Sequence, residues 1–148
     1  MAGPNDRDRD DSRGEFILEL RNSMDELEAL HRFFEQLGER SGWSDRLCLH
    51  LTLACEELLT NTISYGYPEG GEHSIRLSVS PARAFVEIVL EDDAIPFNPL
   101  EAGAPDLEPS LEERAVGGLG IHFVKKLMDD VSYERTSSGN RLVLVKKV

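Results

Sequence analysis

Residues 55–68 read CEELLTNTISYGYP, and residues 117–129 read GGLGIHFVKKLMD. In the first stretch Glu57 and Asn61 are four positions apart, so on a helix both side chains leave the same face. An amide oxygen can ligate Mg²⁺, and a carboxylate one turn earlier can orient or deprotonate an attacking hydroxyl or water. The same spacing also occurs on ordinary solvated helices, so the pair gains meaning only together with the rest of the chain.

The second stretch enters a helix through the loop Gly117-Gly118-Leu119-Gly120. Glycine lets the backbone approach a phosphate closely, and the N-terminus of a helix offers free amides and the positive end of the helix dipole. The loop lacks both the dinucleotide fingerprint and the lysine-serine pair of a Walker loop, so those two nucleotide folds are excluded. A glycine-rich hinge without a ligand is the alternative interpretation.

Between the two stretches, Glu91-Asp92-Asp93 directly follows an apolar run. A carboxylate at the end of a strand can accept a hydrogen bond from an adenine amino group, although an ordinary acidic turn would have the same sequence. Residues 93–117 contain Pro96, Pro99, Pro105 and Pro109 and few periodic apolar positions. Loops of this length are usually lids or disordered segments, and we expect a lid here.

Outward from these segments, hydrophobic periodicity predicts three helices and five strands. The expected strands cover 15–20, about 75–79, 85–90, 131–136 and 141–147, and the expected helices begin at Ser23, run from Ser44 to about Tyr65, and run from Gly118 to about Asp130. This order predicts an α+β fold, a two-layer sandwich with helices on one face of a mixed, mostly antiparallel sheet. Residues 1–13 are polar and charged, so we expect a disordered tail before a single domain at 14–148.

Three local patterns predict how elements end. Ser23 and Glu26 fit a capping box, in which the hydroxyl and the carboxylate each satisfy a free backbone amide. Gly66 is expected to end the second helix in the left-handed conformation, and Pro68 cannot continue that helix. Residues 80–83 (SPAR) are expected to form the turn between two strands.

The chain is acidic, with 28 Asp and Glu against 16 Lys and Arg and a formal net charge of −12. Without a basic stripe it is a poor candidate for nucleic-acid binding, whereas a protein partner with a basic surface fits the charge. No apolar run could span a membrane, and the N-terminus has no apolar signal region. Cys48 and Cys55 lie too far apart along one helix for a disulfide. We therefore expect a cytoplasmic protein with reduced cysteines.

Taken in order, Glu-x-x-x-Asn on a helix, an acidic strand end, and a lid ending in Gly-x-Gly before another helix resemble the GHKL (histidine kinase-like) ATPase superfamily with its Bergerat-type ATP-binding fold. Over residues 15–147 the chain looks most like the small anti-sigma-factor serine/threonine kinases of bacterial partner-switching systems. The resemblance implies a kinase that uses ATP and Mg²⁺ to phosphorylate a small antagonist protein of the anti-anti-sigma type. It also implies that the protein sequesters a sigma factor or similar regulator, and that it forms a homodimer.

The resemblance assigns roles to individual residues. Glu57 would be the general base, Asn61 the Mg²⁺ ligand, and Asp92 the acceptor for the adenine amino group. The phosphates of ATP are implied to contact the backbone amides of the loop Gly117, Gly118, Leu119 and Gly120. Arg114 is implied to be the lid arginine near the γ-phosphate.

The chain also departs from the family pattern. The family's Asp-x-Gly-x-Gly box falls on residues 92–96, so Ala94 and Pro96 replace both glycines. If position 94 had a positive φ, alanine there would cost about 1 kcal/mol or more. The family's threonine near the last hairpin is also missing, and Asn140 and Arg141 stand there instead. Two other hypotheses therefore remain: a protein-sequestering module of the same fold with weak or no catalysis, and a detached catalytic domain that phosphorylates histidine.

Overall fold

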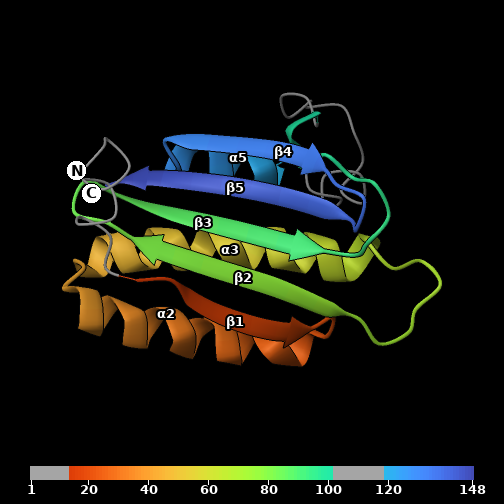
Figure 1. Cartoon of the computed structure of the whole chain (residues 1–148), viewed down its shortest axis with the longest axis horizontal. Helices are drawn as coiled ribbons and strands as arrows, with labels where there is room; N and C mark the ends of the chain where they lie inside the picture. The colour runs from red at the N-terminus through yellow and green to blue at the C-terminus, as the bar shows by residue number, and fades with distance from the viewer. Residues whose placement is uncertain (1–13, 102–118) are drawn as a thin grey trace, which may run out of the picture.

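The computed structural model describes residues 14–101 and 119–148, which form one five-strand sheet with helices on one of its faces (Figure 1). The described elements are β1 (Phe16–Arg21), the 3₁₀ turn η1 (Met24–Glu26), α2 (Leu27–Ser41), α3 (Asp45–Tyr65), β2 (Ser74–Pro81), β3 (Phe85–Asp92), the 3₁₀ turn η2 (Pro99–Glu101), α5 (Leu119–Leu127), β4 (Asp130–Arg135) and β5 (Asn140–Lys147). The strand order is β1-β2-β3-β5-β4, and each neighbouring pair is antiparallel. The expected α+β two-layer fold is confirmed. The tail at 1–13 and most of the expected lid lie outside the described residues.

Helix α3 is the centre of the helical layer, because it packs against both α2 and α5 behind the sheet (Figure 1). Its N-terminus is capped as expected, since the Ser44 hydroxyl accepts a hydrogen bond from Leu47 N at 3.1 Å. One buried stripe recurs every three or four residues, through Leu47, Leu51, Ala54, Leu58 and Asn61, and Cys55 and Leu59 widen it. The stripe that fixes the helix on the sheet therefore ends in a polar residue. No described helix, α3 included, is long and apolar enough to cross a membrane.

The sheet contributes alternate residues to the same core, as the period of two in a strand requires. The buried strand residues of this core are Leu20, Ile75, Leu77, Val79, Val86, Ile88, Leu90, Leu142 and Leu144. Helix α5 adds Ile121 and Val124, both fully buried. The core is therefore continuous from α2 to α5, and it holds the ends of β3, β5 and α3 in a fixed arrangement.

The beginning of α2 differs from the expected capping box. A 3₁₀ turn precedes the helix, and the Ser23 hydroxyl accepts from Asp25 N at 3.3 Å. The Glu26 carboxylate accepts from the Arg21 guanidinium, at 3.0 Å from its terminal nitrogen, and makes no bond back to the Ser23 amide. The reciprocal box is therefore wrong, because a cation at the end of β1 binds the carboxylate instead.

The end of α3 also differs. Gly66 has φ −79° and lies in the right-handed region, so the expected left-handed cap is wrong. A Cβ atom at Gly66 would lie 2.7 Å from the Cβ of Ala94. The segment after β3 runs directly against this position, and Ile95 N donates to Gly66 O at 3.1 Å. Glycine is needed here for the close approach of two segments and not for its backbone freedom.

Two boundaries move by a few residues. Helix α5 ends at Leu127 rather than near Asp130, because Asp129 N already donates to Val145 O at 2.9 Å and Asp130 begins β4. Pro81 belongs to the end of β2, where it pairs with Val86, and not to the following turn. Neither change affects the order of the elements.

Candidate nucleotide-binding site

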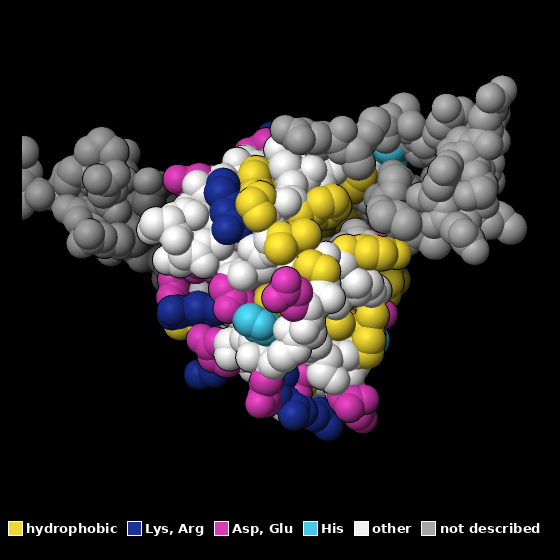
Figure 2. All heavy atoms as spheres, turned by 90° about the vertical axis from the view of Figure 1, so that its right-hand side faces the viewer, with side chains coloured by type: hydrophobic (Ala, Val, Ile, Leu, Met, Phe, Trp, Pro, Cys, Tyr) yellow, Lys and Arg dark blue, Asp and Glu magenta, His cyan; other side chains and the backbone are white. Residues whose placement is uncertain are grey.

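A pocket lies between the C-terminal half of α3, the end of β3 and the start of β5, and it contains about 360 Å³ of atom-free space, part of it open to solvent. Its lining residues are Leu58, Asn61, Thr62, Gly66, Asp92, Ala94, Phe97, Pro99, Asn140 and Leu142. Apolar walls with a few convergent polar groups are typical of small-molecule sites. Figure 2 views this end of the molecule, where hydrophobic side chains gather over the loops. The segment after β3 contributes Ile95 and Phe97, which are 47% and 41% exposed.

Asn61 and Asp92, both predicted as site residues, line this one pocket. Asn61 is only 7% exposed, because it continues the buried stripe of α3. Asp92 is the last residue of β3. The packing of the helix and the strand therefore brings an amide and a carboxylate to the lining of the same pocket.

Glu57 lies one turn before Asn61 and contacts the start of α5. A Cβ atom built on Gly120 would lie 1.7 Å from Glu57 Oε1, so the carboxylate occupies the space that any side chain at position 120 would need. Glu56 is turned away from this contact, and its carboxylate pairs with His31 Nε2 at 3.0 Å. Of the two adjacent carboxylates, only Glu57 faces the residue that ends the glycine loop.

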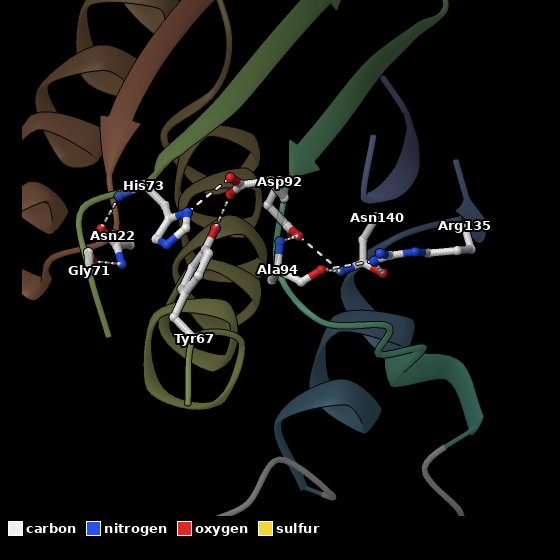
Figure 3. Close-up of polar contacts among 9 residues, drawn as sticks. Asn22, Tyr67, Gly71, His73, Asp92, Ala94, Arg135 and Asn140 are labelled. Carbon is white, nitrogen blue, oxygen red and sulfur yellow. Dashed lines mark hydrogen bonds and ion pairs between the residues drawn. The ribbon is translucent and has the colours of Figure 1, made fainter. Parts of the chain in front are cut away.

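The carboxylate of Asp92 is held by two donors on one oxygen. Oδ1 accepts from Ala94 N at 3.0 Å and from Asn140 Nδ2 at 2.9 Å (Figure 3). Burial raises the pKa of the Asp92 carboxyl, while the hydrogen bonds from Asn140 and Ala94 and the charge of Arg135 lower it again. Asp92 is therefore a partly buried acceptor whose orientation is fixed by the neighbouring strand.

Ala94 adopts no strained conformation. Among the described residues only glycines have positive φ, so the cost considered for an alanine at this position does not arise. The Ala94 side chain is 4% exposed and packs toward the space left by Gly66. The glycine that the family has in this loop is thus replaced by an alanine whose methyl group is accommodated by a glycine elsewhere.

Asn140 also lines the pocket. The resemblance placed it where the family has a threonine, but assigned it no role in the site. Asn140 is 6% exposed and bonds across the end of the sheet to Asp92, 48 positions earlier in the chain. Arg135 joins the same network through a 2.8 Å bond from Nη1 to Ala94 O. A single asparagine after a turn carries no signal for such distant partners, so only the fold reveals it.

A second polar cluster surrounds Asp93. His73 Nδ1 lies 2.9 Å from Asp93 Oδ2, and the Tyr67 hydroxyl donates to Oδ1 at 3.2 Å (Figure 3). The rings of Tyr67 and His73 stack with their centroids 4.5 Å apart. The hydrogen bond with His73 lowers the pKa of Asp93. The adjacent carboxylates of Asp92 and Asp93 thus have opposite environments. Burial raises the pKa of Asp92, whereas hydrogen-bond partners lower the pKa of Asp93.

The predicted phosphate contacts are only partly covered by the structure. Arg114, Gly117 and Gly118 lie outside the described residues, whereas Leu119 and Gly120 form the first turn of α5. Within 14–101 and 119–148, no group of His, Cys, Asp or Glu side chains is arranged to hold a metal ion. Among the described residues, Asn61 is the one that the resemblance assigns as the Mg²⁺ ligand, and it lines the pocket.

The comparison with known proteins agrees with this geometry. The sequence profile of the histidine kinase-like ATPase domain matches residues 20–146. The chain belongs to the histidine kinase-like ATPase family. Its similar proteins include the serine/threonine-protein kinase BtrW of Bordetella bronchiseptica, 31% identical over 76% of this chain and 79% of that protein. They also include the serine-protein kinase RsbW of Bacillus subtilis, 30% identical over 68% and 66%.

A third relative is the anti-sigma F factor of Clostridium novyi, which is 28% identical over 64% of this chain and 67% of that protein. These names confirm the resemblance to anti-sigma-factor kinases that the glutamate-asparagine pair and the glycine loop indicated. Within the family, the chain has the Glu57–Asn61 pair and Gly120, and it carries Ala94 where the family pattern has glycine.

The opposite environments of the two aspartates predict opposite effects of pH on stability. The folded-state pKa of Asp92 lies above its ordinary value of 3.8, so its ionisation costs stability as the pH rises through that value. The free energy of unfolding of Asp92→Asn should therefore improve relative to wild type between pH 4 and pH 7. Asp93 has a lowered pKa, so its carboxylate contributes stability at neutral pH that is lost on acidification.

The matched variant Asp93→Asn should accordingly lose stability relative to wild type at pH 7, with a smaller difference as the pH falls below 3.8. Urea unfolding of the three proteins across this range measures both trends. A relative stability of Asp92→Asn that falls as the pH rises would contradict the burial of that carboxylate.

Proposed function

We propose that this chain is an ATP-dependent serine/threonine protein kinase of the anti-sigma-factor type. The observation that carries the proposal is the position of Glu57, whose carboxylate lies against Gly120 while Asn61 and Asp92 line the pocket beside it. A carboxylate between the residue that ends a glycine loop and this pocket is placed to act on a hydroxyl that approaches a terminal phosphate. The names of the relatives, two serine kinases and an anti-sigma factor, support the same assignment.

The adenine base is assigned to this pocket on the chemistry of its lining. Leu58, Leu142 and Ala94 supply apolar walls, and Asp92 supplies a fixed carboxylate acceptor for the adenine amino group. The buried amide of Asn61 offers an oxygen ligand of the kind that Mg²⁺ prefers. When bound, Mg²⁺ would neutralise charge on the phosphate oxygens. Phosphate contacts are proposed for the loop at 117–120, from its backbone amides.

In the proposed reaction Glu57 acts as the general base. It accepts the proton of a seryl or threonyl hydroxyl as the oxygen of that hydroxyl forms a bond to the γ-phosphorus of ATP. The bond between the γ-phosphorus and its bridging oxygen breaks, and ADP leaves with that oxygen. Arg114 is proposed to lie near the γ-phosphate, where a guanidinium would offset charge that develops during transfer.

The proposed protein substrate is a small antagonist of the anti-anti-sigma type, and the proposed sequestered partner is a sigma factor or similar regulator. The printed name of the Clostridium relative supports the second assignment. The net charge of −12 favours partners whose contact surface is basic. A cytoplasmic location stays a prediction from the composition and the N-terminal sequence, and a homodimer stays a prediction of the family resemblance.

Glu57→Gln should abolish transfer while leaving the nucleotide bound, because the amide keeps the size of the side chain but cannot take a proton. A general base contributes about 10²–10⁴-fold, so the rate should fall by that factor. The assay measures transfer of ³²P from [γ-³²P]ATP to purified anti-anti-sigma-type proteins. The matched control is Glu56→Gln, which changes the neighbouring carboxylate that pairs with His31 and should retain transfer.

The phosphorylated product distinguishes the alternatives to this proposal. Phosphoserine and phosphothreonine survive acid, whereas an acid-labile product would identify a histidine kinase domain. Full transfer by Glu57→Gln would remove the role assigned to that carboxylate. Nucleotide binding without transfer to any antagonist would favour the protein-sequestering module.

Gly120→Ala should also impair transfer, through its effect on Glu57. The new Cβ atom would lie 1.7 Å from Oε1, so the carboxylate must move. The atoms that move belong to the flexible side chain of Glu57, and alanine favours a helix over glycine. The free energy of unfolding should therefore stay within about 1 kcal/mol of wild type. Urea unfolding and the same transfer assay measure both quantities. Wild-type transfer in this variant would show that the contact has no role in the reaction.

A further inference from the structure

Asn140 occupies a central place at the end of the sheet. It is the first residue of β5, where it pairs with Asp92 of β3 on one side and with Arg135 of β4 on the other. The buried polar residues of the described chain are Asn61, Ser78 and Asn140. A buried amide is costly unless its donors and acceptors are all used, so the partners of Asn140 show what the residue does.

The amino group of Asn140 bonds to the segment that starts with Asp92. Nδ2 donates to Asp92 Oδ1 and to Ile95 O, both at 2.9 Å, and lies 3.5 Å from Ala94 O. The side chain of Asn140 therefore links both the Asp92 carboxylate and the Ile95 carbonyl to the start of β5. In a loop without the family's two glycines, these bonds hold the chain in place.

The carbonyl oxygen of the same amide accepts from three donors. Oδ1 lies 2.5 Å from the Tyr133 hydroxyl, 3.2 Å from Arg135 Nη1 and 3.4 Å from Phe97 N. An arginine nitrogen and a backbone amide can only donate, and a carbonyl such as Ile95 O can only accept. The orientation of the Asn140 amide is thus decided by its neighbours, and its amino group must face Asp92 (Figure 3).

The turn before Asn140 is built close to Asp92 as well. Gly139 has φ +156°, and a Cβ atom there would lie 1.8 Å from Asp92 O. No other residue fits this position without moving the end of β3. The backbone of the last hairpin and the side chain of Asn140 therefore approach Asp92 together, and both fix where its carboxylate lies.

We propose that Asn140 is a positioning residue that holds Asp92 and the loop 93–97 in the arrangement that selects a 6-aminopurine. The inference rests on the proposed function, because it requires Asp92 to accept a hydrogen bond from the adenine amino group. Asn140 acts through Asp92, because its Nδ2 donates a hydrogen bond to Oδ1 of that carboxylate. The rotation of the carboxylate about its bond is then restricted before the nucleotide arrives, and less entropy is lost on binding.

The test compares binding of ATP and of ITP, which carries a 6-oxo group in place of the 6-amino group, by calorimetric titration of the full chain with Mg²⁺ present. Wild type should prefer ATP. Asn140→Ala should lower the ATP-to-ITP affinity ratio by about tenfold, the effect of one hydrogen bond to a charged group. Asn140→Leu should lower it too, because it keeps roughly the size of the side chain, adds no charge and removes the donor to Asp92. It is the variant to use if Asn140→Ala fails to fold.

Ser78→Ala is the matched control, since Ser78 is another buried polar residue of the sheet and lies on β2, outside the pocket lining. It should keep the wild-type ratio. Equal weakening of ATP and ITP by the Asn140 variants, with the ratio unchanged, would overturn the inference and leave Asn140 a purely structural residue. If wild type itself binds neither nucleotide or does not distinguish them, the role proposed for Asp92 fails, and the inference fails with it.

Discussion

Helix α3 buries Leu51, Ala54 and Leu58 almost completely against the sheet, and the same helix carries Glu57 and Asn61. Full burial of one leucine contributes about 1.5–3 kcal/mol. Rotating α3 by one residue would expose these side chains, so the hydrophobic core fixes the direction of the polar ones. Asn61 then lines the pocket and Glu57 faces α5 as a consequence of this packing. The chemistry proposed for the site depends on this packing.

The pocket residues at the end of β3 and the start of β5 are held by close contacts between segments that are distant in sequence. Gly66 leaves space for Ala94, and Gly139 leaves space for the backbone of Asp92. Asn140 then binds the carboxylate of Asp92 at 2.9 Å, which offsets part of the cost of burying that charge. The family has glycines within the loop after β3. In this chain Gly66 and Gly139 lie beside that loop, and the amide of Asn140 binds it.

Local periodicity was enough to predict the order of the elements, because each signal lies within a single element. The joint role of Asn61 and Asp92 was implied by the resemblance to the GHKL ATPases, and both residues line one pocket. Features that depend on another segment could not be predicted in this way. Glu26 binds Arg21 instead of closing a capping box, and Gly66 is right-handed because the loop after β3 packs against it. Asn140 has partners up to 48 positions away, and nothing in its own neighbourhood indicates them.

The proposed function requires α3 to present a Mg²⁺-dependent nucleotide site through Asn61. A calorimetric titration of ATP into wild type and Asn61→Ala, each with Mg²⁺ and with EDTA, measures this dependence. Mg²⁺ should strengthen binding to wild type, and this gain should be lost in the variant, which should keep the weaker, metal-free binding. An equal gain from Mg²⁺ in both proteins, or no binding of ATP to folded wild type, would contradict the proposed function.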